Sequence, residues 1–204
     1  MPTDAVVHLI DDDEGVRQAV AFLLATSGFA VRVYESAIAF LDALPSVQPG
    51  CVVTDVRMPG MDGLALQREL KTRDIALPVI VMTGHGDVPL AVEAMKAGAV
   101  DFIEKPFNDE SLLSAIRVAI DRHARDAQRG GEIAAINRKL GTLSPREREV
   151  LDGLVAGLPN KSIAYDLKIS ARTVEVHRAN VMTRMGANSV ADLVRMVFVA
   201  RSSD

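Results

Sequence analysis

Acidic, hydroxyl and basic side chains follow four apolar, β-branched runs of this sequence, each at the point where the run ends. They are the acidic run Asp11-Asp12-Asp13, then Asp55, Thr83 and Lys105. Carboxylates that gather in one place repel one another, so we expect a hard cation that prefers oxygen ligands, such as Mg²⁺, to balance them. A metal ion, a hydroxyl group and a lysine beside a carboxylate suit phosphoryl transfer, which depends mainly on positioning and charge stabilisation. These residue types therefore predict phosphoryl chemistry.

The side chains can meet only if the apolar runs are parallel strands of one sheet, separated by helices. The hydrophobic pattern predicts strands near residues 5–10, 30–34, 51–54, 79–82 and 100–104, and helices near residues 14–27, 36–44, 64–73, 87–97 and 109–122. Ser36, Asp87 and Asp109 are the expected N-caps of three of these helices. Parallel strands bring their carboxyl ends to one edge, where open α/β sheets bind ligands. A single Asp at a strand end is more often a cap or a turn former, but the repetition after four strands favours a shared functional site.

The composition is that of an ordinary globular protein of one or two domains. The chain has 204 residues, of which 49% are hydrophobic and 25% are charged. No apolar run reaches the roughly 18 uninterrupted residues of a membrane helix, and no secretory signal is visible. The single cysteine, Cys51, excludes an intrachain disulfide and is expected to be a small core residue. We therefore expect a cytoplasmic protein without a membrane partner.

Charge divides the chain into an acidic part and a mildly basic part. Residues 1–140 hold 14 Lys and Arg against 20 Asp and Glu, a net charge of −6, whereas residues 141–204 hold 9 against 7, a net charge of +2. Nucleic acid, if bound, is therefore expected at the C-terminal part, although charge alone is a weak signal.

The pattern predicts three segments. They are an α/β domain over residues 1–123, a partly helical linker over 124–140 and a helical domain over 141–204. Within the linker we expect the preceding helix to break at Gly130-Gly131 and to resume briefly before the last domain.

The last segment predicts four short helices and no strand. Ser144 is an expected N-cap with Glu147 in the capping-box position, and Pro145 between them suits the first turn of a helix. Further helices are expected over residues 161–167, capped by Asn160, over 171–185, capped by Ser170, and over 190–199, capped by Ser189.

The third of these helices has a face that suits the DNA major groove. Its inward side is expected to hold Val174, Val181 and Met185, and its outward side holds Arg172, Glu175, Val176, Ala179 and Thr183. Arg172 and Glu175 can reach base edges, and Val176 can contact a thymine methyl group. Taken in isolation, the same pattern is also typical of a solvated amphipathic helix.

The α/β part resembles the receiver domain of two-component response regulators. The resemblance covers about residues 6–122 and rests on LIDDD at 9–13, DVRMPGMDG at 55–63, VMTG at 81–84 and KPF at 105–107. It implies a doubly wound, five-stranded parallel sheet of strand order 2-1-3-4-5, and a cis peptide bond between Lys105 and Pro106.

The resemblance implies how the phosphoryl group and the metal would be held. Asp55 would accept the phosphoryl group of a phosphohistidine, and no added base is needed because a carboxylate is already ionised at neutral pH. The cofactor would be Mg²⁺ (or Mn²⁺). Its ligands would be Asp12 directly, Asp11 mainly through water, Asp55, and the backbone carbonyl of Arg57.

The resemblance also implies a switch. Thr83 would bond the phosphoryl group after transfer, and Lys105 would pair with it. Thr83 and Phe102 would move together, with Phe102 changing rotamer, and the rearrangement would expose a dimer surface around Val92, Lys96 and Phe102.

The helical part resembles the LuxR-type helix-turn-helix. The resemblance covers about residues 141–201 and rests on LSPREREVL at 143–151, NK at 160–161 and SARTVEVH at 170–177. It implies that 171–185 is the recognition helix, that 160–168 supports it and that 189–200 offers a dimer surface. The implied phosphate contacts are Lys161, Thr173, His177 and Arg178. Other members often have a basic residue where Glu175 and Ala179 stand, so base readout would differ here.

Together the two parts resemble the NarL/FixJ subfamily of response regulators, and within it the FixJ group. The closest likeness lies in TGHGDVP at 83–89 and GLPNKSIAYDL at 157–167. It implies a transcription activator of nitrogen-fixation and microaerobic genes that is not a turnover enzyme. Its partners would be a FixL-like sensor histidine kinase, double-stranded promoter DNA, RNA polymerase and, when phosphorylated, a second copy of the chain.

Two other interpretations compete with this one. Asp11 and Asp13 form the Asp-x-Asp of haloacid-dehalogenase-like phosphatases, with Asp11 as nucleophile, but that assignment leaves Asp55 and the C-terminal helices without roles. The other is a degenerate receiver that works without phosphorylation, against which the intact Asp55, Thr83 and Lys105 argue. The operator, the signal of the kinase, the rigidity of the linker and any inhibition of the DNA-binding domain by the receiver stay open.

Overall fold

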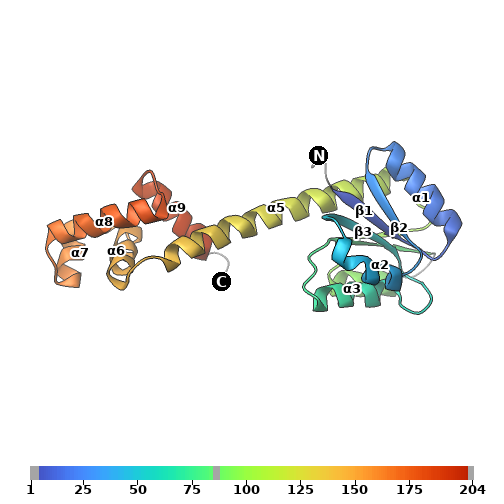
Figure 1. Ribbon diagram of the computed structural model, residues 1–204, viewed down its shortest axis with the longest axis horizontal. Coiled ribbons are helices and arrows are strands. Elements are labelled where there is room, and N and C mark those ends of the chain that lie inside the picture. Colours follow the sequence, from blue (N-terminus) through green and yellow to red (C-terminus); the bar gives the residue numbers. More distant parts are fainter. Residues whose placement is uncertain (1–4, 85–87, 202–204) are drawn as a thin grey trace. The chain divides into compact units, whose positions relative to one another are not determined.

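The computed structural model describes residues 5–84 and 88–201, and it divides into two compact units, Met1–Arg125 and Asp126–Asp204. Figure 1 labels elements of both units where there is room. The N-cap predicted at Asp87 lies outside the described residues. None of the described helices combines the length and the apolar character needed to cross a membrane.

The first unit is built on one parallel sheet. Its strands are β1 (Val6–Ile10), β2 (Ala30–Tyr34), β3 (Gly50–Asp55), β4 (Val79–Thr83) and β5 (Asp101–Glu104). They lie side by side in the order β2-β1-β3-β4-β5. The register pairs Ile10 with Thr54 and Thr83 with Glu104, which brings the carboxyl ends of the strands to a common edge. The predicted fold class and strand order are confirmed.

Helices cover both faces of this sheet (Figure 1). They are α1 (Glu14–Thr26), α2 (Ala37–Ala43) with the short turn η1 (Leu44–Ser46), α3 (Gly63–Thr72), α4 (Val88–Ala97) and α5 (Asp109–Gly141). One core cluster joins the sheet to α1 and α5, and a second joins it to α2, α3 and α4. Each fully buried Leu, Ile or Phe side chain in these clusters contributes roughly 1.5–3 kcal/mol relative to its exposed state.

Two of the three predicted N-caps in this unit can be compared with the structure. The hydroxyl of Ser36 accepts from the backbone N–H of Ala39, as predicted. Asp109 is instead the first residue of α5, and the Asn108 side chain accepts from Ser111 N–H at 2.8 Å. The cap was predicted one residue too late because Asn and Asp serve equally well at this position.

The second unit is all helical over its described residues. It contains the end of α5 together with α6 (Pro145–Val155), α7 (Asn160–Leu167), α8 (Ala171–Met185) and α9 (Val190–Arg201). Ile136 of α5 lies in the same core cluster as Val150, Val174 and Leu193. The capping box of Ser144 and Glu147 is present, and Ser170 caps α8, as predicted.

The predicted helix break at Gly130-Gly131 is wrong, because α5 is continuous from Asp109 to Gly141. A glycine in a helix costs about 1 kcal/mol relative to alanine, which is not enough to stop a helix that is already nucleated on both sides. Here Ile120 before the glycines and Ile136 after them are both buried in core clusters. Anchored flanks therefore override the local propensity.

Candidate functional site

The carboxyl edge of the sheet holds a compact charge cluster. Asp11 follows β1, Asp55 ends β3 and Lys105 follows β5. The Lys105 ammonium nitrogen lies 2.7 Å from Asp11 Oδ2 and 2.5 Å from Asp55 Oδ1. Burial alone would lower the pKa of Lys105, but its hydrogen bonds to Asp11 and Asp55 outweigh burial and raise that pKa. The lysine therefore stays protonated and holds both carboxylates in place.

Asp55 is fixed by the loop that follows it. Its Oδ2 accepts from the backbone N–H of Arg57 at 2.6 Å, while its Oδ1 faces Lys105. The loop then turns beneath the strand, where a Cβ at Gly63 would lie 2.3 Å from the carbonyl oxygen of Asp55. Only glycine allows this approach, so the sequence around Gly63 sets the position of the Asp55 backbone.

The acidic run after β1 has a different use for each aspartate. Asp11 is 1% exposed, and its Oδ1 accepts from the backbone N–H of Asp13. The Asp13 carboxylate caps α1 by accepting from Val16 N–H at 3.0 Å. Asp12 is exposed and lines the neighbouring cavity. Sequence reasoning missed Arg17, whose Nη1 donates to the backbone carbonyl of Asp11 at 2.7 Å and braces the run.

A cavity of about 490 Å³ adjoins this cluster. Its lining includes Asp12, Arg57, Asp62 and Leu90. Hard oxygen donors from Asp11, Asp12 and Asp55 suit Mg²⁺ better than a soft metal. Among the described residues, however, no three acidic, histidine or cysteine side chains are arranged to hold a metal by themselves. The predicted Arg57 carbonyl and water would have to complete the ligand set, because Lys105 lies between two of the carboxylates.

The two predicted switch residues, Thr83 and Phe102, make no side-chain hydrogen bond to the cluster that the structure describes. Thr83 is fully buried, and its hydroxyl donates to the Gly84 carbonyl at 3.4 Å, a long and weak bond. Phe102 pairs with Val81 across β4 and β5, and it packs partly buried against the second core cluster. The Thr83 hydroxyl is thus available to exchange a weak partner for a better one.

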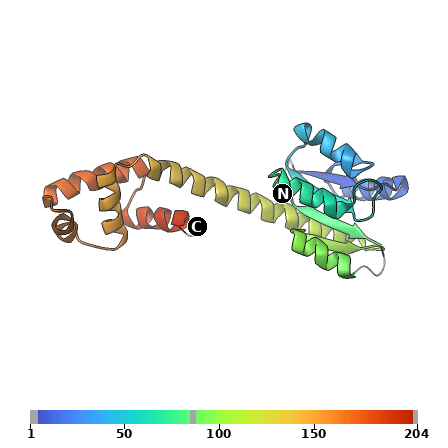
Figure 2. The same ribbon diagram turned by 90° about the horizontal axis from the view of Figure 1, so that it is seen from below.

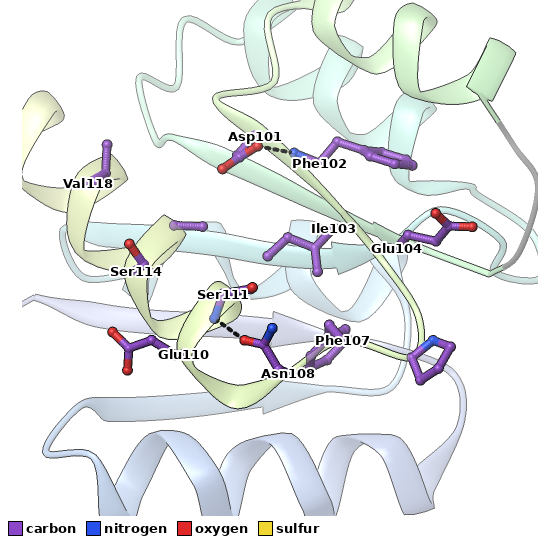
Figure 3. A pocket seen from close by; sticks show the side chains of 12 residues that line it. Asp101, Phe102, Ile103, Glu104, Phe107, Asn108, Glu110, Ser111, Ser114 and Val118 are labelled. Atoms are coloured by element: carbon purple, nitrogen blue, oxygen red, sulfur yellow. Dashed lines mark hydrogen bonds between the residues drawn. The ribbon is translucent and has the colours of Figure 1, made fainter.

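A larger groove of about 960 Å³ runs along β5 and the start of α5 (Figure 3). Its acidic lining residues are Asp101, Glu104 and Glu110. In this groove Asp101 accepts from the N–H of Phe102, and Asn108 accepts from Ser111. Its lining includes none of the four residues Asp11, Asp12, Asp55 and Lys105, whereas Asp12 and Arg57 line the smaller cavity. The smaller cavity is therefore the one that adjoins the predicted phosphoryl-transfer residues.

The second unit presents the outward face of α8 as a separate candidate surface. Val174, Val181 and Met185 are buried, as their spacing predicts. Arg172, Glu175, Val176, Ala179 and Thr183 are exposed, and Val176 is 56% exposed. The helix therefore offers a narrow, reachable face, as major-groove reading requires.

Four predicted phosphate contacts lie around this face, and three of them, Thr173, His177 and Arg178, are half-buried. Lys161 is exposed and Thr173 is half-buried. The N-cap of α7 is Pro159 rather than the predicted Asn160, because the carbonyl of Pro159 already accepts from Ile163 N–H. Arg178 is half-buried and donates to the Asn160 Oδ1 at 3.5 Å. His177 is also half-buried, and its Nδ1 has no partner among the described residues.

Comparison with known proteins places both units in described families. The response regulator receiver domain matches residues 7–117, and the luxR family of bacterial regulatory proteins matches residues 141–197. The chain is 56% identical over 200 residues to the transcriptional regulatory protein FixJ of Azorhizobium caulinodans, which covers 98% of this chain and 95% of that protein. It is 57% identical over 194 residues to FixJ of Rhizobium meliloti, covering 95% of each.

Solved structures of response regulators are also similar to this chain. The response regulator StyR is 39% identical with a TM-score of 0.83, covering 95% of this chain and 98% of its own. Full-length FixJ from B. japonicum is 51% identical with a TM-score of 0.63, covering 97% of this chain and 98% of its own. The haloacid-dehalogenase alternative finds no support in these matches.

Proposed function

Because the chain belongs to the FixJ-like response regulators, transcription activators with a receiver domain and a LuxR-type DNA-binding domain, we propose that it accepts a phosphoryl group on Asp55 from a FixL-like sensor histidine kinase. Phosphorylation would make it dimerise and bind promoter DNA, from which it would recruit RNA polymerase in the cytoplasm. By likeness to FixJ, the genes would be those of nitrogen fixation and microaerobic growth. The protein would turn over no substrate of its own.

The observation that carries the proposal is the placement of Lys105 against both Asp11 and Asp55. In the transfer step an Asp55 oxygen would attack phosphorus, the bond from phosphorus to the kinase histidine would break, and an acyl phosphate would form. Lys105 would then move from the carboxylate to a phosphoryl oxygen and offset its charge. When bound by Asp11, Asp12, Asp55 and the Arg57 carbonyl, Mg²⁺ would supply further neutralisation of the phosphoryl oxygens.

The weak bond of Thr83 supports the switch. A phosphoryl group on Asp55 would offer the Thr83 hydroxyl a charged acceptor in place of the Gly84 carbonyl, and charge-assisted hydrogen bonds are about twice as strong as neutral ones. Movement of Thr83 would leave space that Phe102 can enter from the neighbouring strand. A few kcal/mol is enough to shift most of a two-state population.

The dimer surface would be formed by α4 and β5. Val92 is 49% exposed on α4. Lys96, also on α4, and Asp101, on the contacting strand β5, are exposed too. In a two-fold dimer the same surface of each copy must be complementary to itself. This surface meets that requirement because it carries an apolar residue, Val92, a cation, Lys96, and a carboxylate, Asp101. DNA-binding units paired in this way would reach two half-sites of a palindromic operator.

Trapping of the acyl phosphate tests the proposal. The chain would be incubated with Mg²⁺ and acetyl phosphate, reduced with borohydride and mapped by mass spectrometry. Label on Asp55 is expected because its carboxylate faces Lys105 and is less buried than that of Asp11. Label on Asp11 would overturn the assignment of the acceptor, and no label on any aspartate would overturn the proposed phosphorylation.

A further inference from the structure

The last turns of α5 belong structurally to the DNA-binding unit. Ile136 is 4% exposed and packs in the same core cluster as Val174 and Met185 of α8. Three residues later on α5, the Lys139 ammonium group donates to the backbone carbonyl of Met185 at 2.9 Å. Figure 2 shows the end of α5 meeting the end of α8. A segment that the sequence assigned to the linker thus holds the recognition helix.

The contact between Lys139 and Met185 lies at the carboxyl end of α8, where a cation stabilises a helix. The last carbonyls of a helix lack partners within the helix and carry partial negative charge, which a lysine offsets. Gly186, at φ +67°, ends α8 in the left-handed region. A Cβ at Gly186 would lie 3.3 Å from the Lys139 nitrogen, so glycine leaves the lysine room to approach.

The charge of Lys139 also acts at the start of α9. The Asp192 carboxylate accepts from Arg195 and from the backbone N–H of Asn188, and these two bonds lower the pKa of Asp192, with the charge of Lys139 adding a smaller effect. Lys139 therefore bonds a carbonyl at the end of α8, and its charge is favourable for a carboxylate in the first turn of α9.

A second hydrogen bond, made by Arg184, also restrains the end of α8. Arg184 donates to the backbone carbonyl of Thr142 at 2.6 Å and also lies 3.5 Å from the buried carboxylate of Glu147. The end of α8 is thus bonded to the last turn of α5, to the loop that follows it and to the first turn of α6. The exposed face at its beginning has no such restraint from this segment.

We propose that Lys139 is a positioning residue for base reading, which fixes the direction of α8 from its carboxyl end without touching DNA. The inference rests on the proposed role of α8 in DNA binding. Glu175 lies ten residues before Met185, or about 15 Å along the axis, so a tilt of roughly 4° about the helix end moves it by about 1 Å. A shift of that size spoils hydrogen bonds to base edges while leaving looser phosphate contacts largely intact.

The test uses the full-length phosphorylated chain and a duplex selected by the wild type from a random pool. Lys139→Met removes the donor, Lys139→Arg keeps it, and Arg138→Met removes the same charge from an exposed neighbour on the same turn. For Lys139→Met we expect affinity for the selected duplex to fall about tenfold, which corresponds to roughly 1.4 kcal/mol. Affinity for an unrelated duplex should stay within about twofold, Lys139→Arg should restore most of the loss, and Arg138→Met should resemble the wild type.

Salt dependence separates positioning from a direct phosphate contact. A lost phosphate contact would flatten the slope of log affinity against log salt by about one, whereas a positioning role leaves the slope unchanged. A flatter slope for Lys139→Met, an equal loss on both duplexes, or a matching loss in Arg138→Met would each overturn the proposal. If the wild-type chain selects no duplex at all, the proposed DNA-binding function fails and this inference fails with it. If the wild type selects one and Lys139→Met binds it equally well, only the positioning role fails.

Discussion

The two units place their functional side chains in opposite environments. In the receiver unit, Asp11, Asp55 and Thr83 are at most 8% exposed, and the Lys105 ammonium group holds both Asp11 and Asp55. In the DNA-binding unit, the candidate reading residues lie outward on a single helix, with Val176 at 56% exposure. Chemistry on a carboxylate benefits from fixed, partly desolvated charges, whereas recognition of a duplex requires side chains that it can reach. Single substitutions should therefore abolish phosphorylation in the first unit, but should change DNA affinity only in part in the second.

The sharpest effect is expected at the acceptor. Asp55→Asn should abolish Mg²⁺-dependent labelling by acetyl phosphate, since an amide is not a competent nucleophile, while Asp12→Ala should raise the Mg²⁺ requirement steeply. Asp62→Asn is a matched control in the same cavity, because asparagine caps α3 as well as aspartate does. Phosphoprotein gels measure the label. Undiminished labelling of Asp55→Asn would show that Asp55 is not the acceptor and that the receiver unit is less sensitive to single substitutions than we expect.

Loss of the dimer should come next in size. Val92→Arg should accept phosphate yet remain monomeric in light scattering, because two copies of a charge would face each other across the two-fold axis. Affinity for an operator should then fall by roughly 10²–10⁴, the gain that linking two binding units provides. Val33→Arg, at a valine 52% exposed on β2 at the opposite edge of the sheet from β5, is the matched control and should dimerise normally. Normal dimerisation of Val92→Arg would place the dimer surface elsewhere.

Graded effects are expected on α8. Glu175→Ala should mainly relax base preference at one position of each half-site, by about 1–3 kcal/mol of discrimination. Arg178→Ala should weaken binding about equally on all duplexes, and its effect should be small because Arg178 is partly engaged with Asn160. Binding titrations across a set of single-base operator variants measure both. A uniform loss with unchanged preference for Glu175→Ala would show that this face does not read bases.

The mildest prediction is an acid sensitivity confined to the receiver unit. His8 is fully buried in β1 near Tyr34 and Phe40, its Nε2 bonds the Gln48 carbonyl at 2.9 Å, and its Nδ1 has no partner among the described residues. Burial chiefly lowers the pKa of His8, with a smaller effect from Arg32, while the bond to Gln48 opposes it.

The sign follows from proton binding. Below about pH 6.5 the His8 side chain binds a proton in the unfolded chain but not in the folded chain. The free energy of unfolding should therefore decrease as pH is lowered, by at most roughly 1.4 kcal/mol per pH unit. Urea unfolding at pH 7.5 and 5.5 should show this loss in the receiver unit, and His8→Phe should reduce it. An equal loss in His8→Phe would assign the sensitivity to other groups.

Local sequence patterns predicted much of this molecule. The alternation of β-branched runs and helical stretches predicted the five strands, and the strand order followed from the receiver resemblance. Ser36, Ser144 and Ser170 act as the caps they were predicted to be, and the buried side of α8 is the predicted one. These features depend on residues a few positions apart, so periodicity and capping chemistry are sufficient to specify them.

The tertiary structure decided which partner each polar group received. Lys105 bonds Asp11 from 94 positions away and Asp55 from 50, and no local pattern states that one lysine serves both. Asn160 accepts from Arg178 instead of capping α7, and α5 runs through Gly130-Gly131 because both of its ends are packed in cores. Lys139 reaches the end of α8 only because the helices of its unit fold together. A charged side chain bonds whatever group the packing brings within about 3 Å, and the packing depends on contacts summed over the whole unit.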